Sequence, residues 1–245
     1  MAGVELCNLS KHFLLGERII SAVQSVTTTI SHGSFTVIVG KSGCGKTTLL
    51  RLLGGLEELT EGQIHWTDIE KQQLLPKIGF VFQEPRLMPW LTVYENMAFS
   101  LDKSLLPEAV ATIVNPILNQ LGLESFRDAY PAQLSGGMAH RVSLGRTLCY
   151  DPDLILMDEP FGALDYFTRK KLQLEMVELF LLQKKTVIFV THDVSEAIYL
   201  GQRILVMDEG RIVKEIPIEM SYPRNLASSD ILDIQTEILE SLGSF

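Results

Sequence analysis

Long apolar runs are missing from this chain of 245 residues, although 46 % of its residues are hydrophobic. The longest uninterrupted runs, such as 154–157 and 187–190, cover only a few residues, whereas a membrane-spanning helix needs about 20. Runs this short, each followed by a polar residue, predict the central strands of a parallel sheet that is covered on both faces. We therefore expect a globular chain that does not itself cross a membrane.

Cysteine and positive charge are also scarce. Cys7, Cys44 and Cys149 are widely spaced and form no Cys-x-x-Cys pair, which predicts a reducing compartment and no structural metal. The formal net charge of −9 disfavours a nucleic-acid partner, because a phosphate backbone attracts basic surfaces. The first residues show no basic segment followed by an apolar stretch, so we expect no secretory leader and a cytoplasmic location.

Glycine is concentrated in the turn that follows the apolar run 35–39. This turn matches Gly-x-x-x-x-Gly-Lys-Thr between an expected strand and an expected helix, the context that a P-loop requires. Its residues are Gly40, Lys41, Ser42, Gly43, Cys44, Gly45, Lys46, Thr47 and Thr48. The glycines let backbone N–H groups point inward, where a Cβ atom would block an anion, and the helix adds the positive end of its dipole. Because Lys46 can reach the β- and γ-phosphates and the Thr47 hydroxyl can ligate Mg²⁺, the turn predicts binding of a nucleoside triphosphate.

Two carboxylates, Asp158 and Glu159, end the apolar run 154–157. Ligands of open α/β sheets lie at the carboxyl ends of the strands. Asp158 is suited to the Mg²⁺ shell, and Glu159 to orienting or deprotonating the attacking water. A strand that merely ends in solvated acids is the simpler alternative, which the P-loop in the same chain disfavours.

A second glycine pair opens another expected helix. The sequence Leu-Ser-Gly-Gly at 134–137 precedes a helical run over 139–148. A serine and two glycines at a helix start make a second anion-binding N-terminus. One nucleotide does not need two such sites within one subunit.

Together these segments resemble the ATP-binding cassette (ABC) ATPases. That family has, in order, a P-loop, Val-Phe-Gln, Leu-Ser-Gly-Gly, a strand ending in Asp-Glu, Gly-Ala-Leu-Asp and Val-Thr-His-Asp. The same order occurs here over nearly the whole chain. The resemblance implies an ATPase in which two copies, or this chain and a second cassette, pair head to tail. Each ATP would lie between one subunit's P-loop and the other subunit's Ser135, Gly136 and Gly137, and hydrolysis would release the pair.

The resemblance also implies roles for single residues. Gln83 would sense the Mg²⁺ and water site, Asp165 would relay between the two sites, and His192 would hydrogen-bond the γ-phosphate. A strand-end histidine that is merely satisfied by Asp193 is the alternative for His192. Phe13 occupies the place of an aromatic residue that stacks on adenine, with an ordinary core position as the alternative.

The fold expected from this pattern is α/β. Strands and helices alternate after residue 153, as in βαβ units, and Pro116 should kink or break the helix 107–121. The resemblance implies a P-loop NTPase (RecA-like) core with an N-terminal antiparallel β-subdomain and a helical insertion that carries the signature. We expect a single ABC ATPase domain over 1–245, with the core at about 1–89 and 151–228, the helical subdomain at about 90–150 and a C-terminal helix at about 229–242.

Two positions depart from the family's pattern. Met138 stands where glutamine is commonest, and Ala139 with His140 replaces a more polar pair before Arg141. The expected phosphate contacts come from Ser135 and backbone N–H groups, so Met138 should be tolerated. We expect His140 to lie on the surface of its helix.

The segment 84–93 is similar to its counterpart in the ATPase subunits of bacterial importers for nitrate, sulfonate and taurine. In that family this surface receives a short cytoplasmic helix of the permease, which implies contacts from Pro85, Arg86, Leu87 and Trp90. Packing of Trp90 against the helical insertion is the alternative. The implied location is peripheral, at the cytoplasmic face of the inner membrane, with a permease as direct partner and an extracytoplasmic solute-binding protein as indirect partner. The solute is inferred only from the resemblance to this group of importers.

Two rival functions stay open. A soluble ABC ATPase without a permease, of the Fe–S assembly or repair type, would carry the same motifs, but the apolar segment after Gln83 favours a membrane partner. A P-loop kinase that phosphorylates a small molecule would need an acceptor pocket, and its Leu-Ser-Gly-Gly segment would have no role.

Overall fold

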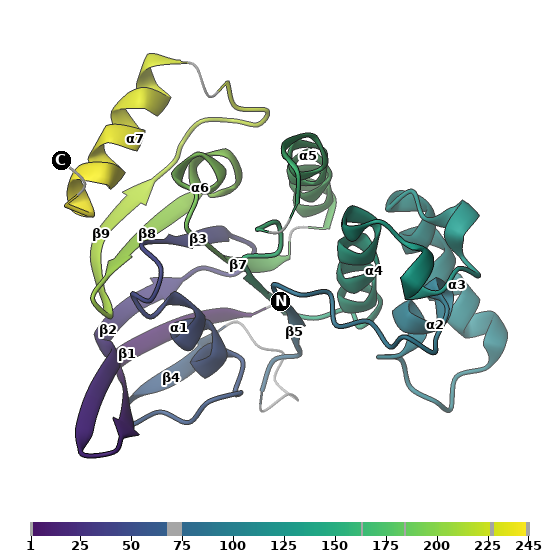
Figure 1. Cartoon of the computed structure of the whole chain (residues 1–245), viewed down its shortest axis with the longest axis horizontal. Coiled ribbons are helices and arrows are strands. Elements are labelled where there is room, and N and C mark those ends of the chain that lie inside the picture. Colours follow the sequence, from purple (N-terminus) through teal and green to yellow (C-terminus); the bar gives the residue numbers. More distant parts are fainter. Residues whose placement is uncertain (1, 68–74, 163, 184, 226–227, 244–245) are drawn as a thin grey trace.

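The structure is a computed structural model that describes residues 2–67, 75–162, 164–183, 185–225 and 228–243. Ala163 of the Gly-Ala-Leu-Asp motif lies outside these ranges. The described strands form a three-stranded and a six-stranded sheet, and helices pack around them (Figure 1). In these ranges no helix combines the length and the apolar character that crossing a membrane would take.

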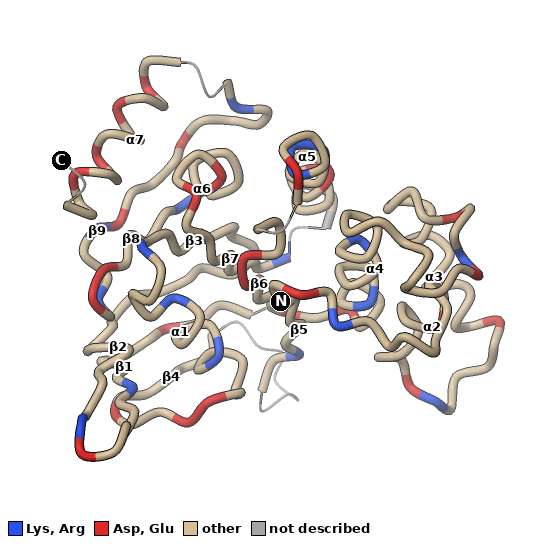
Figure 2. The backbone as a smooth tube through the Cα atoms, viewed as in Figure 1, with Lys and Arg blue, Asp and Glu red and all other residues tan. Residues whose placement is uncertain are grey.

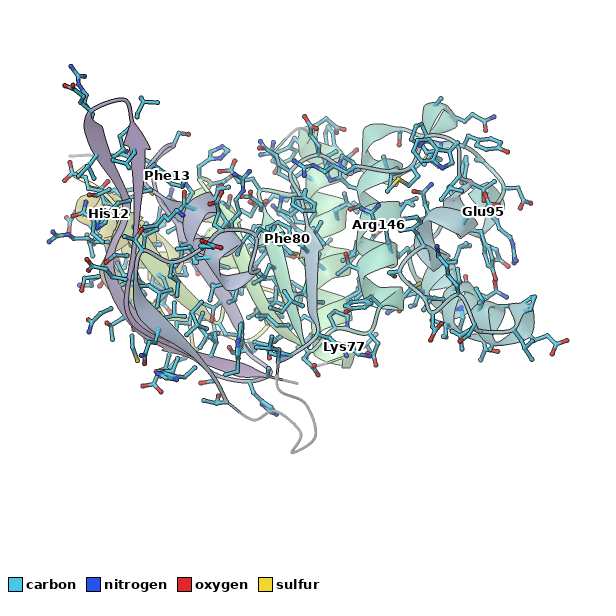
Figure 3. All side chains as sticks on the ribbon, turned by 90° about the horizontal axis from the view of Figure 1, so that it is seen from below. His12, Phe13, Lys77, Phe80, Glu95 and Arg146 are labelled. Carbon is cyan, nitrogen blue, oxygen red and sulfur yellow. The ribbon has the colours of Figure 1, made fainter. Side chains whose placement is uncertain are left out.

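The smaller sheet is antiparallel and has the strand order β2-β1-β4. Its strands are β1 (Gly3–Leu15), β2 (Arg18–Ile30) and β4 (Glu61–Thr67). The first two form a long hairpin whose tip projects from the molecule, with Phe13 near that end (Figure 3). Alternating Val, Ile and Thr residues favour these strands. The expected N-terminal antiparallel subdomain is therefore confirmed.

The larger sheet has the strand order β5-β6-β7-β3-β8-β9. Its strands are β3 (Phe35–Val39), β5 (Ile78–Val81), β6 (Leu154–Asp158), β7 (Thr186–Thr191), β8 (Arg203–Asp208) and β9 (Arg211–Pro217). All pairs are parallel except β8 with β9. Every residue of β3, β6 and β7 is buried, as the short apolar runs predict. Strand β9 was not predicted.

Each face of the central strands packs against a different layer. Ile38 and Leu156 point into a cluster with α1 (Lys46–Leu53) and the inner face of the antiparallel sheet. Val37 and Met157 point into the other cluster, with α5 (Tyr166–Gln183), α6 (Val194–Leu200) and α7 (Ser229–Ser241). This alternation follows from the two-residue period of a strand. Helix α1 is therefore held between two sheets.

The remaining helices gather at the far end of the molecule, beyond β5 (Figure 1). They are α2 (Val93–Ala98), α3 (Pro107–Gln120), the short η1 (Glu124–Phe126) and η2 (Pro131–Gln133), and α4 (Gly136–Cys149). Of the expected kink or break at Pro116, the structure excludes the break, because helix α3 continues through this residue; the kink stays a prediction. The lost backbone hydrogen bond is tolerated because Val114 and Leu118 anchor the same stretch in the core.

The C-terminal helix α7 lies against β9 and α6 (Figure 1). Ile231 and Ile238 are buried, while acidic residues recur along the rest of the helix (Figure 2). Glu237 forms an ion pair with Lys214 of β9, at 3.0 Å. This helix is thus tied to the edge of the sheet rather than to the site described next.

Candidate functional site

The P-loop connects β3 to α1, and two of its glycines are required by backbone packing. A Cβ atom on Gly40 would lie 2.1 Å from the Met207 carbonyl oxygen, and one on Gly45 would lie 2.1 Å from the Ala22 carbonyl oxygen. Gly45 also has φ +105°, a conformation that favours glycine. Strands β8 and β2 therefore press on this turn from outside. These two glycines are therefore needed for packing in the fold as well as for the space that an anion would require.

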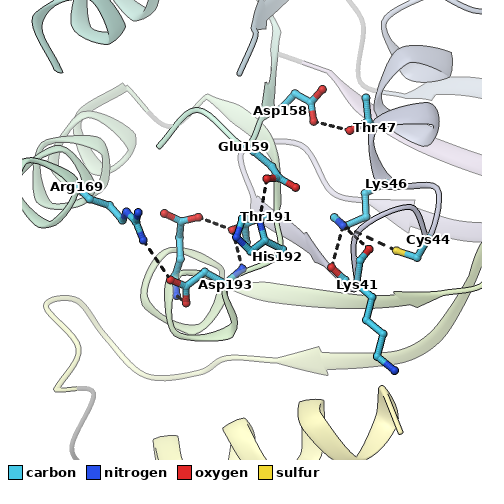
Figure 4. Close-up of polar contacts among 12 residues, drawn as sticks. Lys41, Cys44, Lys46, Thr47, Asp158, Glu159, Arg169, Thr191, His192 and Asp193 are labelled. Carbon is cyan, nitrogen blue, oxygen red and sulfur yellow. Dashed lines mark hydrogen bonds and ion pairs between the residues drawn. The ribbon is translucent and has the colours of Figure 1, made fainter. Parts of the chain in front are cut away.

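Lys46 is buried within the turn that it closes. Its ammonium donates hydrogen bonds to the carbonyl oxygens of Gly40 and Lys41, both at 2.8 Å (Figure 4). Cys44 is buried beside it, and burial raises the pKa of this thiol. A protonated, covered thiol is unreactive, so Cys44 serves as a small packing residue. The side chains of Lys41 and Ser42 are exposed, and Thr48 is half-buried.

Thr47 and Asp158 meet across the junction of α1 and β6. The Thr47 hydroxyl donates to Asp158 Oδ1 at 2.8 Å (Figure 4). Burial raises the pKa of Asp158, which the bond from Thr47 opposes. A bound cation would offset the same burial cost, and one carboxylate with one hydroxyl suits Mg²⁺ in a triphosphate site. The described residues contain no cluster of three or more His, Cys, Asp or Glu side chains that could hold a metal ion, so phosphates and water would complete such a shell.

Glu159 is held directly by His192. Its Oε2 lies 2.8 Å from His192 Nδ1 (Figure 4), so this histidine is not merely satisfied by Asp193. The backbone of Glu159 has φ +42°, a strained value for a residue with a side chain. A Cβ atom placed on Gly162 would lie 3.7 Å from Gln83 Nε2 and 3.9 Å from Glu159 Oε2. The fold therefore brings Gln83, Glu159 and His192 together beside the end of β6.

A buried carboxylate beneath His192 was missed by the sequence analysis. Glu196 accepts hydrogen bonds from the Thr191 hydroxyl and from the Gln173 amide, and burial raises its pKa. Asp193 accepts the Glu196 backbone N–H and caps α6. This network fixes the turn between β7 and α6 on which His192 sits. The spacing Asp-x-x-Glu after His192 is a helix-start signal that could have revealed it.

The Leu-Ser-Gly-Gly segment is a separate, exposed helix start. Ser135 Oγ accepts the Met138 backbone N–H at 3.3 Å and so caps α4. Ser135 and Gly136 are exposed, whereas a Cβ atom on Gly137 would lie 2.5 Å from Thr168 Cγ2 at the start of α5. Helix α4 stands well away from α1 (Figure 1). The two helix starts that the sequence predicts to bind anions therefore lie at different places in the chain's fold.

Asp165 has a local task in the single chain. Its Oδ1 accepts the backbone N–H groups of Phe167 and Thr168, both at 3.1 Å, and so caps α5. Hydrogen bonds, first of all from Thr168, hold the pKa of Asp165 below its usual range. The relay between two sites stays a prediction.

His140 is 5 % exposed, so the expected surface position is wrong. It lies in a small cavity with Leu172 and Met176 of α5. Among the described residues its Nδ1 and the Oε2 of neighbouring Glu175 have no hydrogen-bond partner. Burial lowers the pKa of His140, which keeps the ring neutral.

Phe13 is too exposed to be an ordinary core residue, and Trp90 is too exposed to pack against the helical insertion. Phe13 is 37 % exposed, and Lys11 Nζ lies 4.9 Å from the centroid of its ring. Trp90 is 70 % exposed, so it does not pack into the helical insertion. Leu87, in contrast, is partly buried against the main core.

A groove of about 510 Å³ lies beside the predicted permease contact. Its apolar lining comes from three separate parts of the chain: Ile78, Phe80, Phe82, Met88, Phe99 and Tyr150. Arg146 of α4 donates to the carbonyl oxygens of Pro85 and Arg86, at 3.1 and 3.0 Å, and thereby fixes one wall. The Arg86 guanidinium lies 4.2 Å from the centroid of the Phe82 ring. Sequence analysis missed the groove because its walls are far apart in the chain.

A P-loop between a parallel strand and a buried helix, with Asp158 and Glu159 at the end of a nearby strand, defines a P-loop nucleoside triphosphatase. The ABC transporter family matches residues 23–162, more than half of the chain. This chain belongs to the ABC transporter family, and it is an ATPase of that family.

Curated relatives match over almost the full length. An ABC transporter ATP-binding protein of Methanocaldococcus jannaschii is 42 % identical over 238 residues, which is 96 % of this chain and 89 % of the relative. The aliphatic sulfonates import ATP-binding protein SsuB of Bacillus thuringiensis is 41 % identical over 239 residues, or 97 % of this chain and 94 % of the relative.

Solved structures agree with the fold. A dimeric, post-hydrolysis structure of an ATP-binding cassette bound to ADP and Pi has a TM-score of 0.77 at 35 % identity and covers 89 % of this chain and all of its own. The cassette cbiO1 of Clostridium perfringens, described as part of the transporter complex cbiONQ, has a TM-score of 0.78 at 23 % identity and covers 98 % of this chain and 96 % of its own. At 23 % identity, the similarity to cbiO1 supports the fold alone.

Proposed function

We propose that this chain is the ATP-hydrolysing subunit of an importer for a small anionic or organic solute, and that it works as an ATP-driven head-to-tail dimer on a separate membrane permease. One observation carries the dimer. The P-loop and the exposed Ser135-Gly136 helix start are two anion sites that stand apart in one chain. A second copy brings them to the same triphosphate, and the dimeric relative bound to ADP and Pi supports this arrangement.

At each nucleotide of the proposed dimer, the two subunits contribute different groups. Lys46 and the P-loop N–H groups bind the phosphates, while Thr47 and Asp158 would hold Mg²⁺, which neutralises developing charge on the phosphates. Glu159 orients the attacking water, and His192 fixes the Glu159 carboxylate through the 2.8 Å contact. The partner adds the Ser135 hydroxyl and the backbone N–H groups of its helix start.

The substitution Glu159→Gln tests this assignment. It removes the base but keeps the hydrogen-bonding shape, so turnover should fall by about 10²- to 10⁴-fold while ATP still binds. Size-exclusion chromatography with Mg-ATP should then show an accumulated dimer that wild-type protein forms only transiently. Glu124→Gln, an exposed glutamate in η1, is the control. A Glu159→Gln variant that hydrolyses at the native rate, or that stays monomeric with Mg-ATP, contradicts the assignment.

The groove lined by Phe80, Met88 and Phe99 is proposed as the seat of a permease helix. Most of its lining is apolar, and Arg146 fixes one wall by its hydrogen bonds to the carbonyl oxygens of Pro85 and Arg86. Such a depression suits the apolar face of a short helix. A soluble ABC ATPase without a permease would have no use for it.

Copurification distinguishes these two functions. Phe99→Arg, which places a charge on the groove, should abolish capture of the permease encoded by the neighbouring genes when both are co-expressed in membranes. Phe126→Arg, an exposed phenylalanine of η1 outside the groove, should retain it, and thermal melting checks both folds. Full capture by Phe99→Arg would refute the groove as the permease site. The sulfonate-importer relative supports an anionic solute, which the permease and its binding protein select.

A further inference from the structure

His192 reaches Glu159 from an exposed position. More than half of the histidine side chain, 55 %, is open to solvent, so core packing does not fix the ring. The ring contacts Glu159 Oε2 at 2.8 Å (Figure 4). The position of the ring therefore depends on the backbone from which it projects, which is the turn between β7 and α6.

One hydroxyl group ties this backbone on both sides of His192. Thr191 directly precedes the histidine and is 2 % exposed. Its hydroxyl oxygen accepts the backbone N–H of Asp193 at 3.0 Å (Figure 4), and its hydroxyl proton is donated to the Glu196 carboxylate. Because residue 192 lies between the two tied residues, the hydroxyl sets the direction in which the histidine leaves the strand.

Glu196 anchors this hydroxyl. It lies in the first turn of α6 and is 5 % exposed. One carboxylate oxygen accepts the bond from Thr191, and the other accepts a bond from Gln173 Nε2 of α5 at 2.9 Å. A carboxyl group buried this deeply is costly unless its oxygens are hydrogen-bonded. Because α5 holds one of the oxygens, the carboxyl group is a fixed support for the turn.

The backbone of Glu159 is fixed to the end of the same strand. Its N–H donates to the Val190 carbonyl oxygen at 3.0 Å, and Asp158 pairs with Val190 in the ladder between β6 and β7. Glu159 is thus held one residue away from Thr191. The turn after Thr191 is what sets the distance from the histidine ring to the Glu159 carboxylate.

We infer that Glu196 and Thr191 are positioning residues for ATP hydrolysis, which hold the turn that aims His192 at Glu159. This inference rests on the proposed function, in which Glu159 orients the attacking water and His192 fixes its carboxylate. Glu196 and Thr191 act through His192 and need not touch the nucleotide. Their loss should therefore lower turnover and leave nucleotide affinity nearly unchanged.

Thr191→Val removes the hydroxyl and keeps the branched shape of the side chain. The turn then loses its link to Glu196, so kcat for ATP hydrolysis should fall about 10- to 100-fold, as for a small displacement of a catalytic group. The dissociation constant for Mg-ATP should stay within about twofold. Thr191→Ser restores a hydroxyl at the same place and should recover most of the rate. An unchanged kcat in Thr191→Val would refute the inference.

Thr186, at the other end of β7, provides a matched control. It is fully buried, and its hydroxyl accepts the Gly33 backbone N–H and donates to the Ala2 carbonyl oxygen, both at 2.8 Å. Thr186→Val loses the same kind of hydroxyl bridge and should lower the melting temperature as Thr191→Val does, but kcat should stay within about twofold of wild type. Equal losses of kcat in the two variants would assign the effect to strand stability and refute the positioning role.

The carboxyl group is tested with two substitutions. Glu196→Ala removes both acceptors and should lower kcat as Thr191→Val does. Glu196→Gln should recover most of the rate, because its amide oxygen can accept from Thr191 while its amide nitrogen donates to Gln173 Oε1 once that amide turns over. In the described part of the chain this Oε1 atom has no hydrogen-bond partner. Native kcat in Glu196→Ala would refute the role of Glu196.

A double-mutant cycle separates the inference from the function on which it rests. Single-turnover hydrolysis of radiolabelled ATP follows even slow variants. In a His192→Ala background, Thr191→Val should cause no further loss, because no ring is left to aim. If the two losses instead multiply, Thr191 acts elsewhere and the inference fails while the proposed function stands. If His192→Ala itself hydrolyses ATP at the native rate, the proposed role of His192 fails and the inference fails with it.

Discussion

The two proposed anion sites of this chain are built in opposite ways. The P-loop follows a strand whose five residues are all buried, it is packed by β2 and β8, and Lys46 is hydrogen-bonded within it. The Ser-Gly-Gly helix start is exposed and depends on a single side-chain cap from Ser135. A preformed pocket beside the proposed catalytic carboxylates suits chemistry. An exposed helix start without such carboxylates suits delivery to another molecule.

The largest effect is expected at Ser135, which would lie at the interface between the two subunits of the proposed dimer. Ser135→Arg adds bulk and charge there, so turnover should fall by roughly 10²-fold or more, as when an oxyanion-binding donor is lost. Binding of a nucleotide to the single subunit should stay within about twofold. Ser135→Ala, which loses the cap and the proposed phosphate contact of the hydroxyl but adds no bulk, should cost about 1 kcal/mol of stability. Phosphate release measures turnover, and fluorescent-nucleotide titration measures binding to the single subunit. Native turnover by Ser135→Arg would contradict the proposal that Ser135 acts on the partner's triphosphate.

A smaller effect is expected from the P-loop. A substitution there should weaken nucleotide binding itself, whereas Ser135→Arg should leave binding nearly unchanged. Lys46→Ala removes a charged donor from the phosphates, worth about 1.5–3 kcal/mol, so nucleotide affinity should drop about 10- to 100-fold. Lys41→Ala, in the same turn but with an exposed side chain, should change affinity far less. Equilibrium titration of both variants decides the matter. Equal losses would mean that the turn recognises phosphate through its general positive charge.

The smallest effect concerns stability rather than the site. His140 is neutral in the fold because burial lowers its pKa, whereas the unfolded chain takes up a proton below about pH 6.5. Its contribution to stability is therefore complete above that pH and is lost as the pH falls, by at most about 1.4 kcal/mol per pH unit. Glu175 faces it from α5, and burial raises the pKa of this carboxyl against the pull of Arg141, so Glu175 acts in the opposite direction and at lower pH.

Urea unfolding at pH 7.5 and pH 5.5 measures this slope. His140→Gln should flatten it, because glutamine does not titrate. An exposed histidine, His32, provides the control as His32→Gln. An unchanged slope in His140→Gln would assign the pH dependence to other groups.

Local patterns explain what the sequence predicted well. The runs that became β3, β6 and β7 are apolar at nearly every position, with Thr36 as the exception in the first, because the strands are buried on both faces. The P-loop and the pair Asp158-Glu159 sit at strand ends, so their positions follow from the strands themselves.

The missed features depend on contacts between distant segments. Strand β9 is an edge strand of mixed polarity, entered through a tight turn in which Glu209 and Gly210 both have positive φ. The burial of His140 follows from α4 being enclosed around most of its circumference, which leaves no polar face for a periodicity argument to find. The groove and the Glu196 network likewise join elements that only the tertiary fold brings together.

Helix α4 carries Ser135 at its first turn and Arg146 about 16 Å further along, where the guanidinium holds the carbonyl groups of Pro85 and Arg86. A helix that is held in this way moves as one rigid body. In the proposed dimer, a tilt of α4 that moves Ser135 toward the partner's triphosphate would also move the Pro85 and Arg86 carbonyl groups that Arg146 holds at the groove. One helix would then connect the proposed nucleotide site to the proposed permease groove, with no chain of small rearrangements between them.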